Sequence, residues 1–164
     1  MAAQTKKHTA RDSIIKILEE IIGDDGDFDR KADKWQLDKY TDYSEKPISI
    51  TLGARENNPP FCYMYLATGT SMSLGSASSS EYMKEASERM LRMVNKYNQK
   101  SELVIATIHI DEDNVVYLSL WSATNLTDSM TDGQIKTIYE HHYRNIMSAL
   151  LELSANMEYI KSWL

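Results

Sequence analysis

Apolar residues recur at helical spacing in three parts of the chain, and each recurrence predicts an amphipathic helix. The first stripe consists of Ile14, Ile15, Leu18, Ile21 and Ile22. The second covers about Glu81–Tyr97, where Ser79 or Ser80 can cap the start. The third follows Thr131 and Gln134, which have the spacing of a capping box, and then meets neither Gly nor Pro. We therefore expect a final helix of about 30 residues, which is longer than usual.

Two pairs of apolar segments between these helices predict β-hairpins. Ile48–Leu52 alternates apolar and small polar residues, as in a half-buried strand. Phe61–Leu66 is almost entirely apolar and is expected to be covered on both faces. Leu103–Ile110 and Val115–Trp121 flank an acidic turn at residues 111–114, so we expect them to form the second hairpin.

Three further segments carry weaker patterns. Residues 23–46 are highly charged, and they fit either a ragged strand around Trp35–Tyr40 or a loose helix. Gly69–Ser80 is rich in small residues and is expected to be a flexible loop. Ser122–Thr131 is expected to be a polar connection.

The order of these segments predicts one domain of the α+β class. Residues 1–11 are polar and are expected to form a disordered tail, and residues 12–164 are expected to form the domain. The predicted architecture is an antiparallel sheet packed with N-terminal, central and long C-terminal helices.

The charge balance narrows the classes of partner. The 164-residue chain has a net charge of −6, whereas a protein that binds nucleic acid needs clustered basic residues against the phosphates. The basic pairs Lys6–Lys7 and Arg30–Lys31 stand apart from each other, so we expect no nucleic acid and no membrane surface as a partner. The N-terminal residues lack the apolar core of a secretion signal, and no apolar run reaches transmembrane length, so we expect a cytoplasmic location.

The acidic segment around Asp25 invites comparison with an EF-hand calcium loop. With Asp25 at the first position, Arg30 would replace the glycine that the sixth position needs, and Gln36 would replace the bidentate glutamate of the twelfth. The adjacent His141 and His142 point in directions about 100° apart on a helix, so they do not share one metal ion. His142 lies on the apolar face and is expected to be a core residue. We therefore expect no metal site and no cofactor.

Patterns of common catalytic sites are also missing from the sequence. Cys62 lies within an apolar segment and is expected to be a buried structural thiol. The Gly-rich segment Gly69–Ser80 has no lysine placed to meet a phosphate, because the nearest one, Lys84, lies inside the predicted second helix. No Gly-x-Ser-x-Gly elbow occurs. We therefore expect that the protein is not an enzyme.

Candidate partner-binding residues are large apolar side chains at places where exposure is expected. Met72 and Leu74 lie in the predicted small-residue loop, Trp121 ends its strand, and Trp163 is next to the last residue. Tryptophan is common at binding hot spots, although docking of these tryptophans onto their own domain is the favoured alternative.

The second half of the chain resembles a known family. Asn95–Asn98 closes a helix, a hairpin follows around the acidic turn at residues 111–114, and Thr131–Ile135 opens the final helix. Over about Glu81–Leu153 this order resembles the bacterial YbjN-type family, which has the type III secretion chaperone-like fold. The resemblance implies an α+β domain, often a dimer, that binds proteins in a chaperone-like or regulatory role without catalysis. The charged residues 23–46 depart from the pattern of the family.

Three functions remain open at this point. The first is a non-enzymatic protein-binding module, chaperone-like or regulatory, that contacts another protein or a second copy of itself through its surface. The second is a small-molecule-binding or enzymatic domain with a pocket near Gly69–Ser80. The third is an acidic immunity or inhibitor protein that covers a basic active site.

Overall fold

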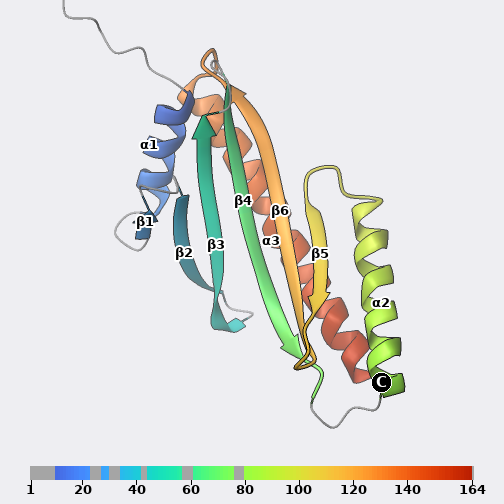
Figure 1. Cartoon of the computed structure of the whole chain (residues 1–164). Coiled ribbons are helices and arrows are strands. Elements are labelled where there is room, and N and C mark those ends of the chain that lie inside the picture. The colour runs from blue at the N-terminus through green and yellow to red at the C-terminus, as the bar shows by residue number, and fades with distance from the viewer. Residues whose placement is uncertain are drawn as a thin grey trace, which may run out of the picture.

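Six strands form one antiparallel sheet in the computed structural model of the protein, in the order β1-β2-β3-β4-β6-β5 (Figure 1). The structure describes residues 10–22, 27–29, 34–41, 44–56, 61–75 and 80–163. In chain order the elements are α1 (Ala10–Ile22), β1 (Asp27–Asp29), β2 (Lys34–Thr41), β3 (Ser44–Glu56), β4 (Phe61–Ser73), α2 (Ser80–Asn98), β5 (Ile105–Ile110), β6 (Val115–Thr127) and α3 (Asp132–Ser162). This arrangement confirms the predicted α+β class, with an antiparallel sheet and N-terminal, central and long C-terminal helices.

The pairing of β4 with β6 joins the two halves of the sheet. These two 13-residue strands keep one register from Phe61 opposite Thr127 to Ser73 opposite Val115. The short strand β5 pairs with the other edge of β6. Because successive side chains of a strand point to opposite faces, the even-numbered residues of β4, β5 and β6 share one face and the odd-numbered residues share the other.

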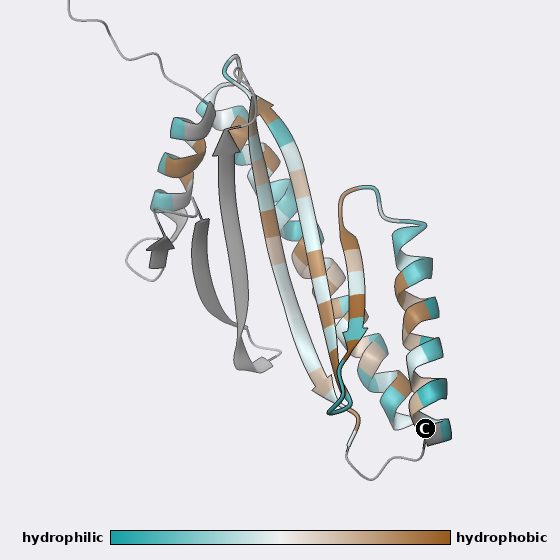
Figure 2. Ribbon diagram, in the orientation of Figure 1, coloured by the Kyte–Doolittle hydropathy of each residue, from teal (hydrophilic) through white to brown (hydrophobic). Residues whose placement is uncertain are grey.

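The helices pack against the even-numbered face. In Figure 1, α3 runs behind β4 and β6, while α1 and α2 lie toward opposite edges of the sheet. The helix α3 contacts β4 and β6, α2 contacts β5 and α3, and α1 contacts α3, β3 and β4. The largest fully buried side chains come from helices and strands alike: Ile14, Met64, Leu66, Met90, Leu118, Leu120, Leu126, Ile135 and Ile146. Figure 2 shows hydrophobic and hydrophilic residues alternating along β6 and along α2, as expected of elements with one buried side.

The predicted capping box begins the 31-residue helix α3. The Gln134 backbone N–H donates to Thr131 Oγ1, and the Thr131 backbone N–H donates to Gln134 Oε1. The next residue, Asp132, joins α1 to this end of α3, because its carboxylate accepts a hydrogen bond of 2.7 Å from Ser13 and lies 3.8 Å from Lys16 Nζ. A carboxylate in the first turn also interacts favourably with the helix dipole.

Two segments that were predicted to be irregular are strands. The strand β4 continues to Ser73, so the prediction of a flexible loop over Gly69–Ser80 is wrong for its first five residues. The strand β6 continues to Thr127, so the predicted polar connection over Ser122–Thr131 is wrong for most of its length. The two errors have one cause, because both segments are held in the sheet by a partner strand: Gly69–Ser73 pairs with Val115–Ser119, and Ser122–Thr127 pairs with Phe61–Leu66. Backbone hydrogen bonds stabilise a strand whose side chains are small or polar.

The N-terminal third contains more strand than its composition suggests. The strand β2 decides between the two alternatives for residues 23–46 in favour of a strand. The helix α1 begins at Ala10, inside the predicted tail, and residues 1–9 lie outside the described part of the chain. The acidic segment that was compared with a calcium loop is described only in part. Asp24 and Asp25 lie outside the described residues, while Asp27 and Asp29 belong to β1.

The free edge of β5 is covered by one side chain of α2. Asn98 donates from Nδ2 to the Ala106 carbonyl at 2.8 Å, and its Oδ1 accepts from the Ala106 N–H at 2.9 Å. The side-chain amide therefore satisfies both backbone groups that Ala106 directs away from β6. At the other end of β5, Asp111 Oδ1 accepts from the backbone N–H groups of Asp113 and Val115, which closes the hairpin turn.

Candidate functional site

The face of the sheet opposite the helices forms the first candidate binding surface, which we call the open sheet face. It consists of Tyr63, Tyr65, Ala67, Gly69 and Ser71 of β4, Tyr117, Ser119, Trp121, Ala123 and Asn125 of β6, and Ile105, Thr107 and His109 of β5. None of the three described helices packs over it. In Figure 1 this face of β4 and β6 is turned toward the viewer.

An aromatic cluster lies on the open sheet face. The rings of Tyr65 and Trp121 are stacked with centroids 4.9 Å apart and planes inclined by 6°. Tyr63 adds a third ring, 6.3 Å from Tyr65 and 6.4 Å from Trp121. Tyr65 itself is buried, whereas Trp121 remains 39% exposed and its neighbour Ile105 on β5 is 59% exposed. The strands therefore present a rigid, partly exposed apolar surface.

A shallow hollow of about 420 Å³ adjoins this cluster. Trp121 and Ile105 stand at one end, and the small residues Gly69 and Ser119 leave the space beside them. Gly69 is required here, since a Cβ atom built on it would lie 2.5 Å from the carbonyl oxygen of Leu118. Close approach of β4 to β6 therefore depends on the missing side chain.

The open sheet face carries no lysine, arginine or carboxylate among its residues as defined above. The nearest acid is Asp111 at the end of β5, whose pKa is lowered chiefly by the hydrogen bond from the Val115 N–H. Its hydrogen bond with Tyr117 raises the pKa of that phenol. In a chain with a net charge of −6, an uncharged face of this kind is suited to an apolar contact more than to an ionic one.

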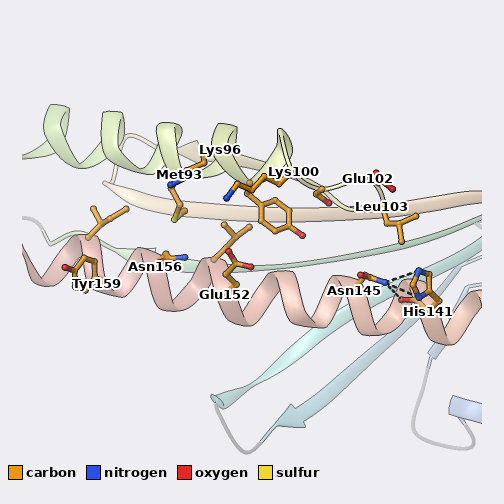
Figure 3. A pocket seen from close by; sticks show the side chains of 14 residues that line it. Met93, Lys96, Lys100, Glu102, Leu103, His141, Asn145, Glu152, Asn156 and Tyr159 are labelled. Atoms are coloured by element: carbon orange, nitrogen blue, oxygen red, sulfur yellow. Dashed lines mark hydrogen bonds between the residues drawn. The ribbon is translucent and has the colours of Figure 1, made fainter.

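A second candidate surface is a groove between α2 and α3, which we call the α2–α3 groove. Its volume is about 720 Å³. Figure 3 shows Lys96 and Lys100 on the α2 side and Glu152, Asn156 and Tyr159 along α3. Farther along α3, Asn145 donates to the His141 carbonyl at 2.7 Å (Figure 3).

A buried polar unit lies between the sheet and α3. Ser122 Oγ is 2.7 Å from the Leu103 carbonyl oxygen and 2.7 Å from His142 Nδ1. A carbonyl can only accept, so the single hydroxyl proton of Ser122 goes to Leu103, and the proton on His142 Nδ1 is donated to Ser122. His142 is 4% exposed, which confirms the prediction of a core histidine. Burial, and secondarily the neighbouring His141, lowers the pKa of His142.

This pKa shift predicts that the protein loses stability as the pH falls below about 6.5. The folded state keeps His142 neutral, whereas the unfolded chain takes up a proton near the ordinary pKa. The contribution of His142 to the free energy of unfolding is therefore complete above a pH of about 6.5. It declines as the pH falls from there toward the lowered pKa of the folded state. Urea unfolding at pH 7.5 and pH 5 measures the decline. His142→Gln should reduce the difference between the two pH values, and the matched substitution His109→Gln on the exposed face should preserve it; an equal reduction in both variants would contradict the assignment.

The four predicted partner-binding residues divide into two groups. Met72 and Leu74 are 7% and 5% exposed and belong to the core, because β4 continues past the point where a loop was expected. They are not available to a partner in this conformation. Trp121 and Trp163 are 39% and 66% exposed, so neither is fully docked onto its own domain. Trp163 instead contacts Tyr159 of the preceding turn, with ring centroids 5.6 Å apart.

Sequence reasoning missed the residues around Trp121. Tyr63 and Tyr65 were assigned to a strand covered on both faces, and Ile105 was assigned only to a strand of the second predicted hairpin. These residues and Trp121 all have odd numbers, which places them on one face of the sheet once the register between the strands is known. The sequence alone does not give that register. The burial of Cys62, at 2% exposure, was predicted correctly.

The described residues contain neither a candidate metal site nor a candidate membrane-spanning helix. They contain no group of three or more His, Cys, Asp or Glu side chains that could hold a metal ion. None of the helices in the part of the chain that the structure describes has both the length and the apolar character needed to cross a bilayer.

Comparison with known proteins identifies the fold. No family model matches the sequence, and no curated protein matches it. Among solved structures, the chain is similar to that of YbjN from E. coli, described as a candidate transcription regulator. The TM-score is 0.52 with 13% sequence identity, and the alignment covers 90% of this chain and 92% of that chain. The predicted YbjN-like fold is thus confirmed, at an identity that supports the fold alone.

Proposed function

We propose that this YbjN-like protein is a non-enzymatic, cytoplasmic protein-binding module that contacts another protein through the open sheet face. The observation that carries this proposal is the exposed pair Trp121 and Ile105, in which the Trp121 ring stacks on Tyr65 of the neighbouring strand. Exposed apolar surface of this kind on a protein with an otherwise complete core is typical of interaction sites.

The geometry favours protein binding because the cluster is rigid before a partner arrives. Trp121 stacks on Tyr65, and both project from long paired strands, so little side-chain freedom is lost on binding. Tryptophan and tyrosine are also the residues that most often dominate interface energies. The adjacent hollow over Gly69 offers space for one apolar side chain of the partner.

The charge of the chain favours a regulatory role through protein contact. YbjN is described as a candidate transcription regulator, and direct binding to DNA would need a basic surface. A net charge of −6 supports an indirect route in which this protein binds another protein. Because the open sheet face carries no acidic side chain, its binding is expected to depend little on salt, in contrast to an inhibitor that covers a basic active site.

The small-molecule alternative loses part of the observation that motivated it. It rested on a loop over Gly69–Ser80, and residues 69–73 of that segment are paired strand. The hollow on the open sheet face is shallow and is bounded mainly by β-strand backbone and small side chains. Ligand sites usually bury most of a small molecule, so this surface fits a protein side chain better.

Site-directed photo-crosslinking in the native cell tests the proposal. A photoreactive phenylalanine analogue at Thr107, which is exposed in the row between Ile105 and His109, is expected to form an adduct with a discrete second protein. The same analogue at Glu158, which is exposed on α3, is the matched control and is expected to give none. Adding Trp121→Ala should reduce the Thr107 adduct about tenfold or more. Equal adducts at both positions, or no effect of Trp121→Ala, would contradict the proposal; an adduct of twice the chain mass would identify a second copy as the partner.

A further inference from the structure

The α2–α3 groove has an apolar floor between polar margins. Met93, Tyr97, Leu103 and Ile160 are half-buried, and Leu153 is buried at its base. They pack against the core from below and leave part of their apolar surface facing the groove. Lysine, glutamate and asparagine side chains stand along the margins (Figure 3). This is the arrangement that receives one face of an amphipathic segment.

The length of the groove selects an elongated occupant. Its lining follows α3 from His141 to Tyr159, a distance of about 27 Å at 1.5 Å per residue. A compact metabolite would cover only a fraction of that length. An α-helix of about 18 residues, with apolar side chains at every third and fourth position, would cover all of it.

The charged side chains at the margins of the groove form no ion pair with each other. Lys96 and Lys100 lie on the α2 side, with Glu102 beyond the end of α2, and Glu152 lies on the α3 side. Within the described residues no ion pair engages any of the four. On the same two helices, charged residues away from the groove do pair along their own helix: Arg89 with Glu85, Arg92 with Glu88, and Arg144 with Glu140. The groove therefore keeps opposite charges free on its two sides.

We propose that the α2–α3 groove is a second binding site, separate from the open sheet face, that takes one amphipathic α-helix of a partner protein. The apolar side of that helix lies on Met93, Tyr97 and Leu153. Its acidic edge meets Lys96 and Lys100, and a basic residue on its other edge meets Glu152. Opposite charges on the two margins fix which way the helix is rotated about its axis, and so give specificity more than affinity.

A charge-exchange experiment with helical peptides tests this proposal. The probes are two synthetic amphipathic helices of about 18 residues with the same apolar face, one with glutamate and one with lysine along the edge that meets α2. The wild-type protein should bind the glutamate-edged peptide about tenfold or more tightly than the lysine-edged peptide. The double variant Lys96→Glu and Lys100→Glu should reverse that preference. Fluorescence anisotropy of labelled peptides measures both, and the Met93 methyl NMR signal shows whether the peptide occupies the groove.

The matched control changes the net charge of the protein by the same amount at two positions outside the groove. Arg89 and Arg92 lie on α2 but do not line the groove. The double variant Arg89→Glu and Arg92→Glu should therefore keep the wild-type preference for the glutamate-edged peptide. Reversal in the control as well would show a general charge effect and would overturn the proposal. Peptide binding that leaves the Met93 methyl signal unchanged would also overturn it, as would a Met93 shift that follows protein concentration without peptide, since the occupant would then be a second copy. Because the two sites share no residue, Trp121→Ala should leave peptide binding unchanged.

Discussion

Replacing Ser122 with alanine is expected to lower the free energy of unfolding by about 2–4 kcal/mol. Ser122 is fully buried, and its hydroxyl joins the Leu103 carbonyl to His142 Nδ1 at 2.7 Å on each side. Removing it leaves the buried N–H of His142 and the partly buried carbonyl of Leu103 without their hydrogen-bond partner, and the second group regains part of its cost from water. Each such group costs about 1–3 kcal/mol when it is removed from water unpaired, and a methyl group offers no compensation. Urea unfolding followed by circular dichroism measures the loss.

Ser119→Ala is the matched control for this prediction. Ser119 lies on the same strand, three residues earlier, with its side chain exposed on the open sheet face. Its loss of stability is expected to stay within about 0.5 kcal/mol, as for most surface substitutions. A similar loss in both variants would mean that the hydroxyl of Ser122 has no special role and that β6 responds to serine removal in general.

Replacing Gly69 with alanine is expected to lower the free energy of unfolding by about 1–3 kcal/mol. The added Cβ would lie 2.5 Å from the carbonyl oxygen of Leu118 and 3.5 Å from the Ser119 Cα. Both are backbone atoms of β6, so neither can move aside without separating the central strand pair. A gain from the lower entropy of the unfolded chain, about 0.4–1 kcal/mol, offsets only part of that cost.

Gly133→Ala is the control, because the same substitution there meets only an ordinary van der Waals contact. Gly133 lies in the first turn of α3, and the nearest atom to an added Cβ is Thr131 Oγ1 at 4.0 Å. Alanine should stabilise this helix by about 0.5–1 kcal/mol. Comparing the two variants by urea unfolding separates the clash from the general effect of glycine. If Gly69→Ala stabilised the protein as Gly133→Ala does, the close approach of β4 and β6 would be disproved.

Helices and hairpins could be predicted because their signals are local. The stripe from Ile14 to Ile22 and the capping box at Thr131 each lie within a few turns of one element. The ends of β4 and β6 could not be predicted in the same way, because Gly69–Ser73 and Ser122–Thr127 have the small and polar residues of a loop. Their strand structure depends on pairing between segments far apart in the sequence, which no local pattern reports.

The candidate sites illustrate the same limit. Trp121 could be selected because a tryptophan stands out by itself, although β6 continues past it to Thr127. Its stacking on Tyr65 and its place beside Ile105 depend on the registers of two strand pairs. Met72 and Leu74 were placed wrongly for the same reason, since the extension of β4 turns them toward the core. The α2–α3 groove lies between two helices. The apolar stripe of each helix predicts that helix, but it does not specify how the two helices pack against each other.

The side chain of Asn98 limits how a partner can use the sheet. A peptide could in principle join the sheet by β-augmentation, adding a strand to the free edge of β5. At Ala106, however, both backbone groups on that edge already bond to the Asn98 amide. An added strand would have to displace this amide and the end of α2 that carries it. The same contact hinders the edge-to-edge stacking by which exposed strands start to aggregate, so the sheet keeps an apolar face exposed while its β5 edge is blocked at Ala106.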